Sequence, residues 1–493
     1  MSHDLYATWA TTEIVRSIKA NPSILFQSNV VTNQLTAFAN RESGRTWPIP
    51  DGRISGNTAN KDFDIAIELK RTNEGLHGVL TAIGQSQAYL HKGYNSSIIV
   101  IPDSYNSFGN PGNYIANVIN QTNNNLPIGV FTYSQPDTSQ TSPFHGKLTC
   151  HRNVGFDIHN APQVNTQISS ATNTQWAHLR EGSSESHAFF KYLQTAKRIS
   201  TNDISIEPNI NHLPQELIDA VSRITNSVSA LNYLSFATGS SLHDLIWRYF
   251  WFENVLTNDI SKLYSSSQPF VVQDSNSPLL LENGVFKKFF SGRSDSIKNK
   301  IIDKLNGGTI SLNDAWDEFA RNIHNRAHSY REDIDSGLSH LGFLEDDGRP
   351  TELGYRFIDI CERTGDFYSG QAKMILGSSI LKNGDLAVLL HYFYKISEEI
   401  FSNDNFAFTS QVNGRYSFNK DAYLDRVKDV LANDLSVMNT ASIRGGQSRK
   451  AFQGELAVLS KFGFIGDRTN RFRIGNGLLI NWPLIQEYLN FEI

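Results

Sequence analysis

Apolar residues along the first 135 positions follow two alternating patterns, one with helical spacing and one typical of strands. The run GVLTAIGQSQAYLHKG has apolar residues at helical spacing and predicts a helix that ends at Gly93. The uninterrupted apolar runs NSSIIVIP and PIGVFTY predict two short buried strands. An earlier helix is predicted from about residue 5 to residue 19. This alternation of helices and strands favours an α/β core.

The rest of the chain changes in character twice. Residues 136–185 are rich in Gln, Ser, Thr and Asn, which is typical of a polar surface connector. From residue 186 onward the pattern is mostly helical and rich in aromatic residues, and 186–300 is predicted to be a helical domain. Its aromatic cluster could form a base-stacking platform, although such clusters more often form core: Trp247, Tyr249, Phe250, Trp251 and Phe252.

One internal repeat stands out, because residues 338–354 and 459–475 share the pattern Leu-Ser-x-x-Gly-Phe-aliphatic. Each copy follows a helix-like run and enters a segment with hairpin-like turn residues. This order resembles the end of a winged helix-turn-helix, in which a helix enters the major groove and a wing follows the backbone. We therefore expect a winged-helix-like module in 301–370 and a second helical, winged-helix-like module in 371–493.

Composition limits the class of protein. A chain of 493 residues is too long for one ordinary core, and 39% apolar residues are typical of a globular protein. No apolar run approaches the ~20 residues that span a bilayer, and the first residues do not resemble a secretory signal. Two cysteines provide neither a disulfide framework nor a zinc quartet. We expect a cytoplasmic protein with no membrane contact.

The net charge of −5 does not by itself indicate nucleic-acid binding, but the local charge near the C-terminus does. Between Met438 and Gly475 there are seven basic residues and two acidic ones. A confined basic patch can hold a phosphate backbone even on an acidic protein. The second module therefore supplies the candidate DNA-binding residues: Arg444, Gln447, Ser448, Arg449, Lys450, Arg471 and Arg473.

The strand-like run IAIELK carries two charges on one face. Side chains alternate along a strand, so Ile65, Ile67 and Leu69 point to one face, while Glu68 and Lys70 point to the other. Two opposite charges on an otherwise core-like strand cost desolvation energy unless they have a use. Magnesium-dependent phosphodiester cleavage needs carboxylate ligands and a group that positions water beside the phosphate. The pair Pro50-Asp51 upstream offers a second carboxylate.

This arrangement, Pro-Asp followed by Glu-x-Lys on an apolar strand, resembles the PD-(D/E)xK nuclease superfamily, which includes most restriction endonucleases. The resemblance covers residues 1–135 and implies a mixed sheet flanked by helices. It implies Asp51 and Glu68 as metal ligands and Lys70 as the catalytic lysine. Gln85, in a Gln-x-x-x-Tyr element of the next helix, joins them as a candidate active-site residue.

The first ligand remains open, because other acidic residues lie nearby in the sequence. Asp62 and Asp64 point to the same strand face as Glu68, so either could replace Asp51. Asp51 is preferred, since two carboxylates four residues apart on one strand are some 13 Å apart. Glu13 and Glu74 are possible extra ligands, although a residue in either position is more often a solvated surface residue.

The resemblance implies a Mg²⁺-dependent DNA endonuclease that binds one or two ions, with Mn²⁺ able to substitute. The expected substrate is double-stranded DNA cut at a specific site, as in a bacterial type II restriction or phage-defence enzyme. A homodimer is possible, no nucleotide cofactor is expected, and any protecting methyltransferase would be a separate protein. Two alternatives remain: an endonuclease directed to methylated bases, and a non-catalytic DNA-binding regulator with a degenerate nuclease fold.

Overall fold

The computed structural model describes the chain in segments, and every structural statement below concerns these residues. They are 3–26, 35–40, 47–58, 61–105, 108–134, 146–155, 176, 186–201, 241–251, 303–304, 307–311, 314, 317–318, 331, 334–367, 370–403, 409–412, 415–434, 452–473 and 477–492. The chain divides into two compact units, one formed by Met1–Glu181 with Met374–Ile493 and the other by Gly182–Lys373.

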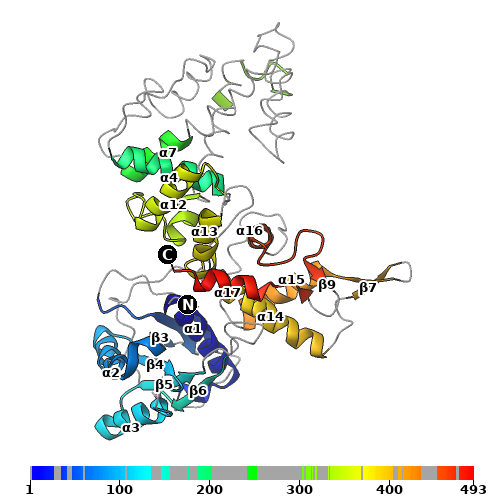
Figure 1. Ribbon diagram of the computed structural model, residues 1–493. Helices are drawn as coiled ribbons and strands as arrows, with labels where there is room; N and C mark the ends of the chain where they lie inside the picture. Colours follow the sequence, from blue (N-terminus) through cyan, green and yellow to red (C-terminus); the bar gives the residue numbers. More distant parts are fainter. Residues whose placement is uncertain are drawn as a thin grey trace. The chain divides into compact units, whose positions relative to one another are not determined.

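A mixed six-stranded sheet dominates the N-terminal part of the first unit (Figure 1). The strands follow one another across the sheet in chain order: β1 (Leu35–Asn40), β2 (Gly52–Thr58), β3 (Lys61–Leu69), β4 (Ser96–Pro102), β5 (Ile128–Tyr133) and β6 (Leu148–Arg152). The central strands β3, β4 and β5 are parallel, and the outer pairs are antiparallel. Parallel neighbours need a crossover, which α2 (Gly75–Lys92) and α3 (Pro111–Asn123) provide.

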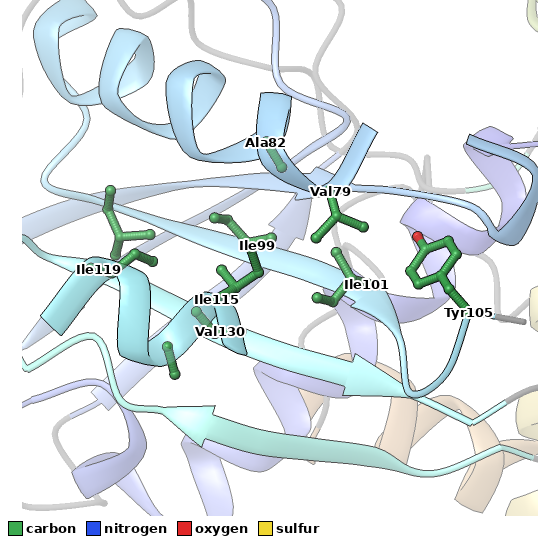
Figure 2. Packing of buried hydrophobic residues seen from close by; sticks show 10 residues of the cluster. Val79, Ala82, Ile99, Ile101, Tyr105, Ile115, Ile119 and Val130 are labelled. Carbon is green, nitrogen blue, oxygen red and sulfur yellow. The ribbon is translucent and has the colours of Figure 1, made fainter. Parts of the chain in front are cut away.

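Helices cover both faces of this sheet. Figure 2 shows α2 and α3 packed on β4 and β5, with Val79 and Ile115 of the helices against Ile99 and Val130 of the strands. The helix α1 (His3–Ala20) packs on β1, β2 and β3 from the opposite face (Figure 1). The face of β3 that carries Glu68 and Lys70 is therefore turned toward α2.

This sheet agrees with the expected α/β core flanked by helices and followed by further helices, but its extent differs from the prediction. Strand β6 lies within 136–185, which was expected to be a polar connector, so the sheet continues past residue 135. Nearly all of 371–493 belongs to the same compact unit as the N-terminal sheet, and its forming a module of its own stays a prediction.

The second unit is helical in the described residues. Its helices include α4 (Ser186–Ser200), α7 (Leu242–Phe250) and α12 (Glu352–Thr364), and α4 packs against both of the others. The aromatic residues Trp247, Tyr249, Phe250 and Trp251 are buried. These four residues are part of the core, which is the commoner of the two roles considered for the cluster. Phe252 lies outside the described residues. The segments 186–300 and 301–370 both fall in this unit, and their division into a helical domain and a winged-helix-like module stays a prediction.

The C-terminal part of the first unit contains helices and two small hairpins. The helices are α13 (Gly370–Lys382), α14 (Leu386–Asn403), α15 (Lys420–Asp429), a short π-helical turn (Val430–Asp434), α16 (Gln453–Phe462) and α17 (Trp482–Asn490). One hairpin is formed by β7 (Thr409–Val412) with β8 (Arg415–Phe418), and the other by β9 (Phe472–Arg473) with β10 (Gly477–Leu478). Two short 3₁₀ turns, Pro22–Ile24 and Thr72–Glu74, complete the N-terminal part.

The sequence repeat corresponds to a recurring local structure. In each copy a helix ends at a glycine in the left-handed region, Gly342 (φ 80°) or Gly463 (φ 79°). The next residue is a fully buried phenylalanine, Phe343 or Phe464. An antiparallel bridge follows, and then a helix capped by Thr351 or Asn481. Helix, glycine, phenylalanine, hairpin and capped helix therefore occur twice.

None of the helices in the described segments has the length and apolar character that crossing a bilayer requires.

Candidate active site

Asp51 is the residue immediately before β2, and the antiparallel pairing of β2 with β3 brings it beside Glu68. Its N–H donates to the Ile67 carbonyl at 2.9 Å, and Leu69 N–H donates to Asp51 Oδ2 at 2.7 Å. Gly52 is the register partner of Ile67. The two residues bonded to Asp51 thus flank Glu68 on both sides. Most of the sixteen residues between Asp51 and Glu68 belong to the antiparallel β2–β3 pair, which brings the two acidic residues next to each other.

Glu68 and Lys70 form a buried ion pair on the face of β3 turned toward α2. Glu68 is 1% exposed, and its Oε1 lies 2.6 Å from Lys70 Nζ. The other carboxylate oxygen accepts a hydrogen bond from the Tyr89 hydroxyl of α2. Glu74 Oε2 lies 3.8 Å from Lys70 Nζ, which places a third carboxylate at the lysine. Buried charges persist when each is paired and hydrogen-bonded, and both conditions hold here.

Burial and crowding of acidic groups perturb the ionisation of this site. Burial raises the pKa of Asp51 to about 7, and the neighbouring Glu68 charge contributes to the rise. His3, the Leu69 N–H and Lys70 act in the opposite direction. Burial, with the negative Glu68 beside it, also raises the pKa of Tyr89 far above its ordinary value. Tyr89 therefore keeps its proton and acts as a donor to Glu68.

His3, at the start of α1, was not found from the sequence. Its Nε2 lies 2.9 Å from the Leu69 carbonyl and 3.4 Å from Asp51 Oδ2. Nearly fifty residues separate it from Asp51, and only the packing of α1 across the sheet brings the two together. No local pattern in the sequence signals this contact. His3 holds both the backbone after Glu68 and the Asp51 carboxylate.

The segment before Asp51 is fixed to α2 by two hydrogen bonds. Lys92 Nζ donates to the Pro48 carbonyl at 2.7 Å, and the Tyr89 hydroxyl also reaches the Ile49 carbonyl at 3.2 Å. Gln85 lies one helical turn before Tyr89, and within the described segments its buried Oε1 has no hydrogen-bond partner. The predicted Gln-x-x-x-Tyr element thus has its tyrosine bound to Glu68 and its glutamine acceptor unsatisfied.

The alternative first ligands are engaged elsewhere. Asp64 Oδ1 lies 2.6 Å from Arg53 Nε in a buried ion pair. Asp62 is exposed and accepts a hydrogen bond from the Asn57 side chain at 2.7 Å. The geometry therefore brings Asp51, and neither of these two residues, into contact with the strand positions that flank Glu68.

Of the possible extra ligands, Glu13 faces α14 and Glu74 stays at the site. The Glu13 carboxylate accepts a hydrogen bond from Tyr392 at 2.9 Å and lies 3.2 Å from Lys395 Nζ. Glu74 Oε1 accepts from the Arg71 N–H at 2.9 Å, so this carboxylate is held next to Lys70. Glu74 therefore lies beside Lys70 at the candidate site, whereas the polar contacts of Glu13 link α1 to α14.

The predicted DNA-binding residues are described only in part. Arg444, Gln447, Ser448, Arg449 and Lys450 lie outside the described residues. Arg471 is half-buried, and Arg473 is exposed on β9.

A hollow of about 270 Å³ lies beside β9, lined by Phe418, Lys420, Arg468, Thr469 and Phe472. The rings of Phe418 and Phe472 are 6.0 Å apart, so β8 and the β9 hairpin meet there. Lys420 was missed in the sequence because 48 positions separate it from Arg468. The lining of this hollow thus combines two cationic side chains with two aromatic rings.

Two carboxylates fit a magnesium site of the usual protein kind. No group of three or more His, Cys, Asp and Glu side chains in the described segments forms a ready metal centre. Magnesium, however, is commonly held by one or two carboxylates, with water and substrate phosphate completing its shell. Asp51 and Glu68 supply that number, and a bound cation would oppose both the burial and the Glu68 charge that raise the pKa of Asp51.

Comparison with protein-family models and with curated protein sequences finds no match for this chain.

Proposed function

We propose that this protein is a Mg²⁺-dependent DNA endonuclease whose active site is formed by Asp51, Glu68 and Lys70. The observation that carries the proposal is that the start of β2 and the end of β3 hold these residues beside one another: Asp51 just before β2, Glu68 in β3 and Lys70 just after it. Asp51 is bonded to both residues that flank Glu68, and Glu68 is paired with Lys70 at 2.6 Å. Two acids and a lysine are the groups that metal-assisted phosphodiester hydrolysis uses.

Asp51 and Glu68 would hold the cation in this reaction. The ion, when bound, neutralises charge on the phosphate and lowers the pKa of a coordinated water. Tyr89 orients Glu68 by donating to its second oxygen, which leaves the remaining lone pairs of the carboxylate for the ion. His3 and the Leu69 N–H fix Asp51 beside it. The ligands are thus positioned before the substrate arrives.

Lys70 would act on the reacting groups rather than on the cation. Its ammonium pairs with Glu68 in the metal-free arrangement, and Glu74 lies on its other side at 3.8 Å. At a bound phosphate, Lys70 would stabilise the charge that develops and orient the attacking water. Tyr133 fixes the backbone by donating to the Lys70 carbonyl at 3.1 Å.

DNA is the proposed substrate because cationic surface accompanies the acidic site in the same unit. The hollow between β8 and the β9 hairpin presents Lys420 and Arg468, and Arg473 is exposed on β9. Contacts with phosphate groups do not distinguish one DNA sequence from another, so a specific enzyme needs a second element that contacts the bases. The helix–hairpin motif at 459–475 is the proposed base-contacting element. A role in restriction or phage defence, with a homodimer and a separate methyltransferase, follows from the superfamily resemblance.

Incubation of supercoiled plasmid with full-length protein tests the proposal. Wild type with Mg²⁺ or Mn²⁺ should produce linear DNA, and Lys70→Ala and Asp51→Asn should lower the rate by about a hundredfold or more. Lys61→Ala is the matched control, because Lys61 lies at the other end of the same strand. It should cut like wild type.

The remaining outcomes separate the alternatives. Binding without cleavage in either metal ion would reject the enzyme and leave a DNA-binding regulator. Cleavage confined to methylated plasmid would identify an endonuclease directed to modified bases. Equal activity of Lys70→Ala and wild type would reject this site.

A further inference from the structure

Trp47 is unusually exposed for a tryptophan. Its side chain is 84% exposed, whereas indole rings in folded proteins are largely buried on average. Four residues further along the chain is Asp51, the proposed metal ligand. An apolar ring kept in water at the edge of a polar site suggests a binding role, because its exposure costs free energy that burial would recover.

The residues that follow Trp47 are fixed in place. The carbonyls of Pro48 and Ile49 each accept a hydrogen bond from a side chain of α2, and the Asp51 N–H donates to β3. These contacts at residues 48, 49 and 51 leave the segment little freedom. Binding to a ring carried on such a segment loses little conformational entropy, because the support is already ordered.

Trp47 is also within reach of DNA held at the site. Consecutive Cα atoms are at most about 3.8 Å apart, so the Cα atoms of Trp47 and Asp51 are separated by less than about 15 Å. Stacked bases along one strand repeat about every 3.4 Å. A base within a few nucleotides of the phosphate at Glu68 can therefore meet the indole.

We propose that Trp47 stacks on an unpaired nucleobase beside the scissile phosphate, so that the preferred substrate has single-stranded character at the cut. The inference rests on the proposed nuclease function. In an intact duplex both faces of each base are covered by neighbouring bases, and only an unpaired or extruded base offers a face to an aromatic ring.

A protein partner fits this surface less well. Beside Trp47 the exposed apolar surface includes Ile49, which is 43% exposed. Specific protein interfaces bury about 800 Å² on each partner, far more than the two exposed apolar side chains of the described segment 47–51 provide. A single base, by contrast, is matched in size by one indole. The acidic pair Asp51 and Glu68, once it holds a cation, attracts the phosphate attached to that base.

Equilibrium DNA binding by the full-length Lys70→Ala protein, which should not cut, tests the inference. One labelled oligonucleotide is presented as a single strand, as a perfect duplex and as a duplex with a central unpaired bubble. Adding Trp47→Ala should weaken binding to the single strand and the bubble by about tenfold, and duplex binding by less than about twofold. Adding Trp47→Phe, which keeps an aromatic ring, should stay within about threefold of the parent protein on all three DNAs.

Phe38→Ala provides the matched control, because Phe38 is another exposed aromatic residue of the same sheet, 46% exposed on β1. It should leave binding to each DNA unchanged. Equal weakening of all three DNAs by Trp47→Ala, or no weakening of the single strand, would overturn the stacking role. Failure of the parent protein to bind any of the three DNAs would reject the nuclease proposal itself, which distinguishes the two failures.

Discussion

At the scale of single residues, the ionisation of Asp51 connects the candidate site to the stability of the fold. Burial and the Glu68 charge raise its pKa from the ordinary 3.8 to about 7. Between these two values the folded chain binds more protons at Asp51 than the unfolded chain does. The contribution of Asp51 to the free energy of unfolding therefore falls as pH rises from about 4 to about 7, because a group adds stability with rising pH only where the unfolded state binds more protons.

Asp51→Asn should remove this pH-dependent penalty. In EDTA, the variant should gain stability relative to wild type between pH 5 and pH 8, by about 1 kcal/mol or more, since one pKa unit corresponds to about 1.4 kcal/mol. Chemical denaturation at the two pH values measures the difference. Asp62→Asn changes an exposed acid close by in the sheet and should follow wild type. If the stability of Asp51→Asn and that of wild type show the same pH dependence, the surroundings of Asp51 do not raise its pKa.

The site residues differ in how far the sequence alone could indicate them. Glu68 and Lys70 are local neighbours, so strand alternation is enough to place them on one face. Asp51 could be named only by resemblance, since its position depends on the pairing of β2 with β3. His3 had no signal, because its contact with Asp51 arises from the packing of α1 on the sheet. For the same reason the sequence could not show that Glu13 pairs with Tyr392 of α14.

At the scale of elements, the repeated motif depends on a glycine that ends a helix. Gly463 has φ 79°, a left-handed conformation that costs any residue with a Cβ about 1 kcal/mol or more. Its N–H bonds to Ser460 O, and the following Phe464 N–H bonds to Leu459 O at 3.0 Å. The turn therefore closes the helix and directs Phe464 into the core.

Gly463→Ala should destabilise the protein by about 1 kcal/mol or more. Gly84→Ala is the opposite control, because Gly84 lies inside α2 with no heavy atom within 4 Å of an added Cβ. Alanine should stabilise that helix by about 0.5–1 kcal/mol. Urea denaturation of both variants measures the two signs. A neutral or stabilising Gly463→Ala would contradict the role of the left-handed turn.

The elements that the sequence indicated are those with strong local patterns. Strands β4 and β5 are continuous apolar runs, and α1 and α2 have helical periodicity, so local pattern alone indicates them. Strand β6, with the sequence LTCHR, has neither an apolar run nor clean alternation, and most of its residues are only half-buried. Its strand conformation comes from pairing with β5 at the edge of the sheet, which a local pattern cannot reveal.

At the scale of the whole molecule, segments far apart in the sequence form one compact unit. Glu13 of α1 accepts from Tyr392 and lies 3.2 Å from Lys395, both on α14. Such long-range packing has no local signal in the sequence, because buried contacts and not sequence proximity define a compact unit.

The charge of the molecule is also distributed unevenly, and this allows the DNA contact to be tested apart from the chemistry. The chain has a net charge of −5, yet Lys420 and Arg468 line the same hollow beside β9. Neutralisation of a DNA phosphate by these two cations would release counterions from the DNA. The logarithm of the binding constant would then fall with the logarithm of salt concentration, with a slope proportional to the number of phosphates neutralised.

Lys420→Ala with Arg468→Ala should weaken DNA binding about uniformly across sequences and reduce the salt slope by about 1 for a single phosphate. Lys428→Ala, at the other end of α15, should leave the slope unchanged. Binding isotherms of full-length protein at several salt concentrations in EDTA measure the slope without cleavage. A double variant with the wild-type slope would show that the hollow holds no phosphate. A slope reduced by about 2 would mean that the two cations neutralise separate phosphates, so that DNA lies across the hollow rather than placing one phosphate in it.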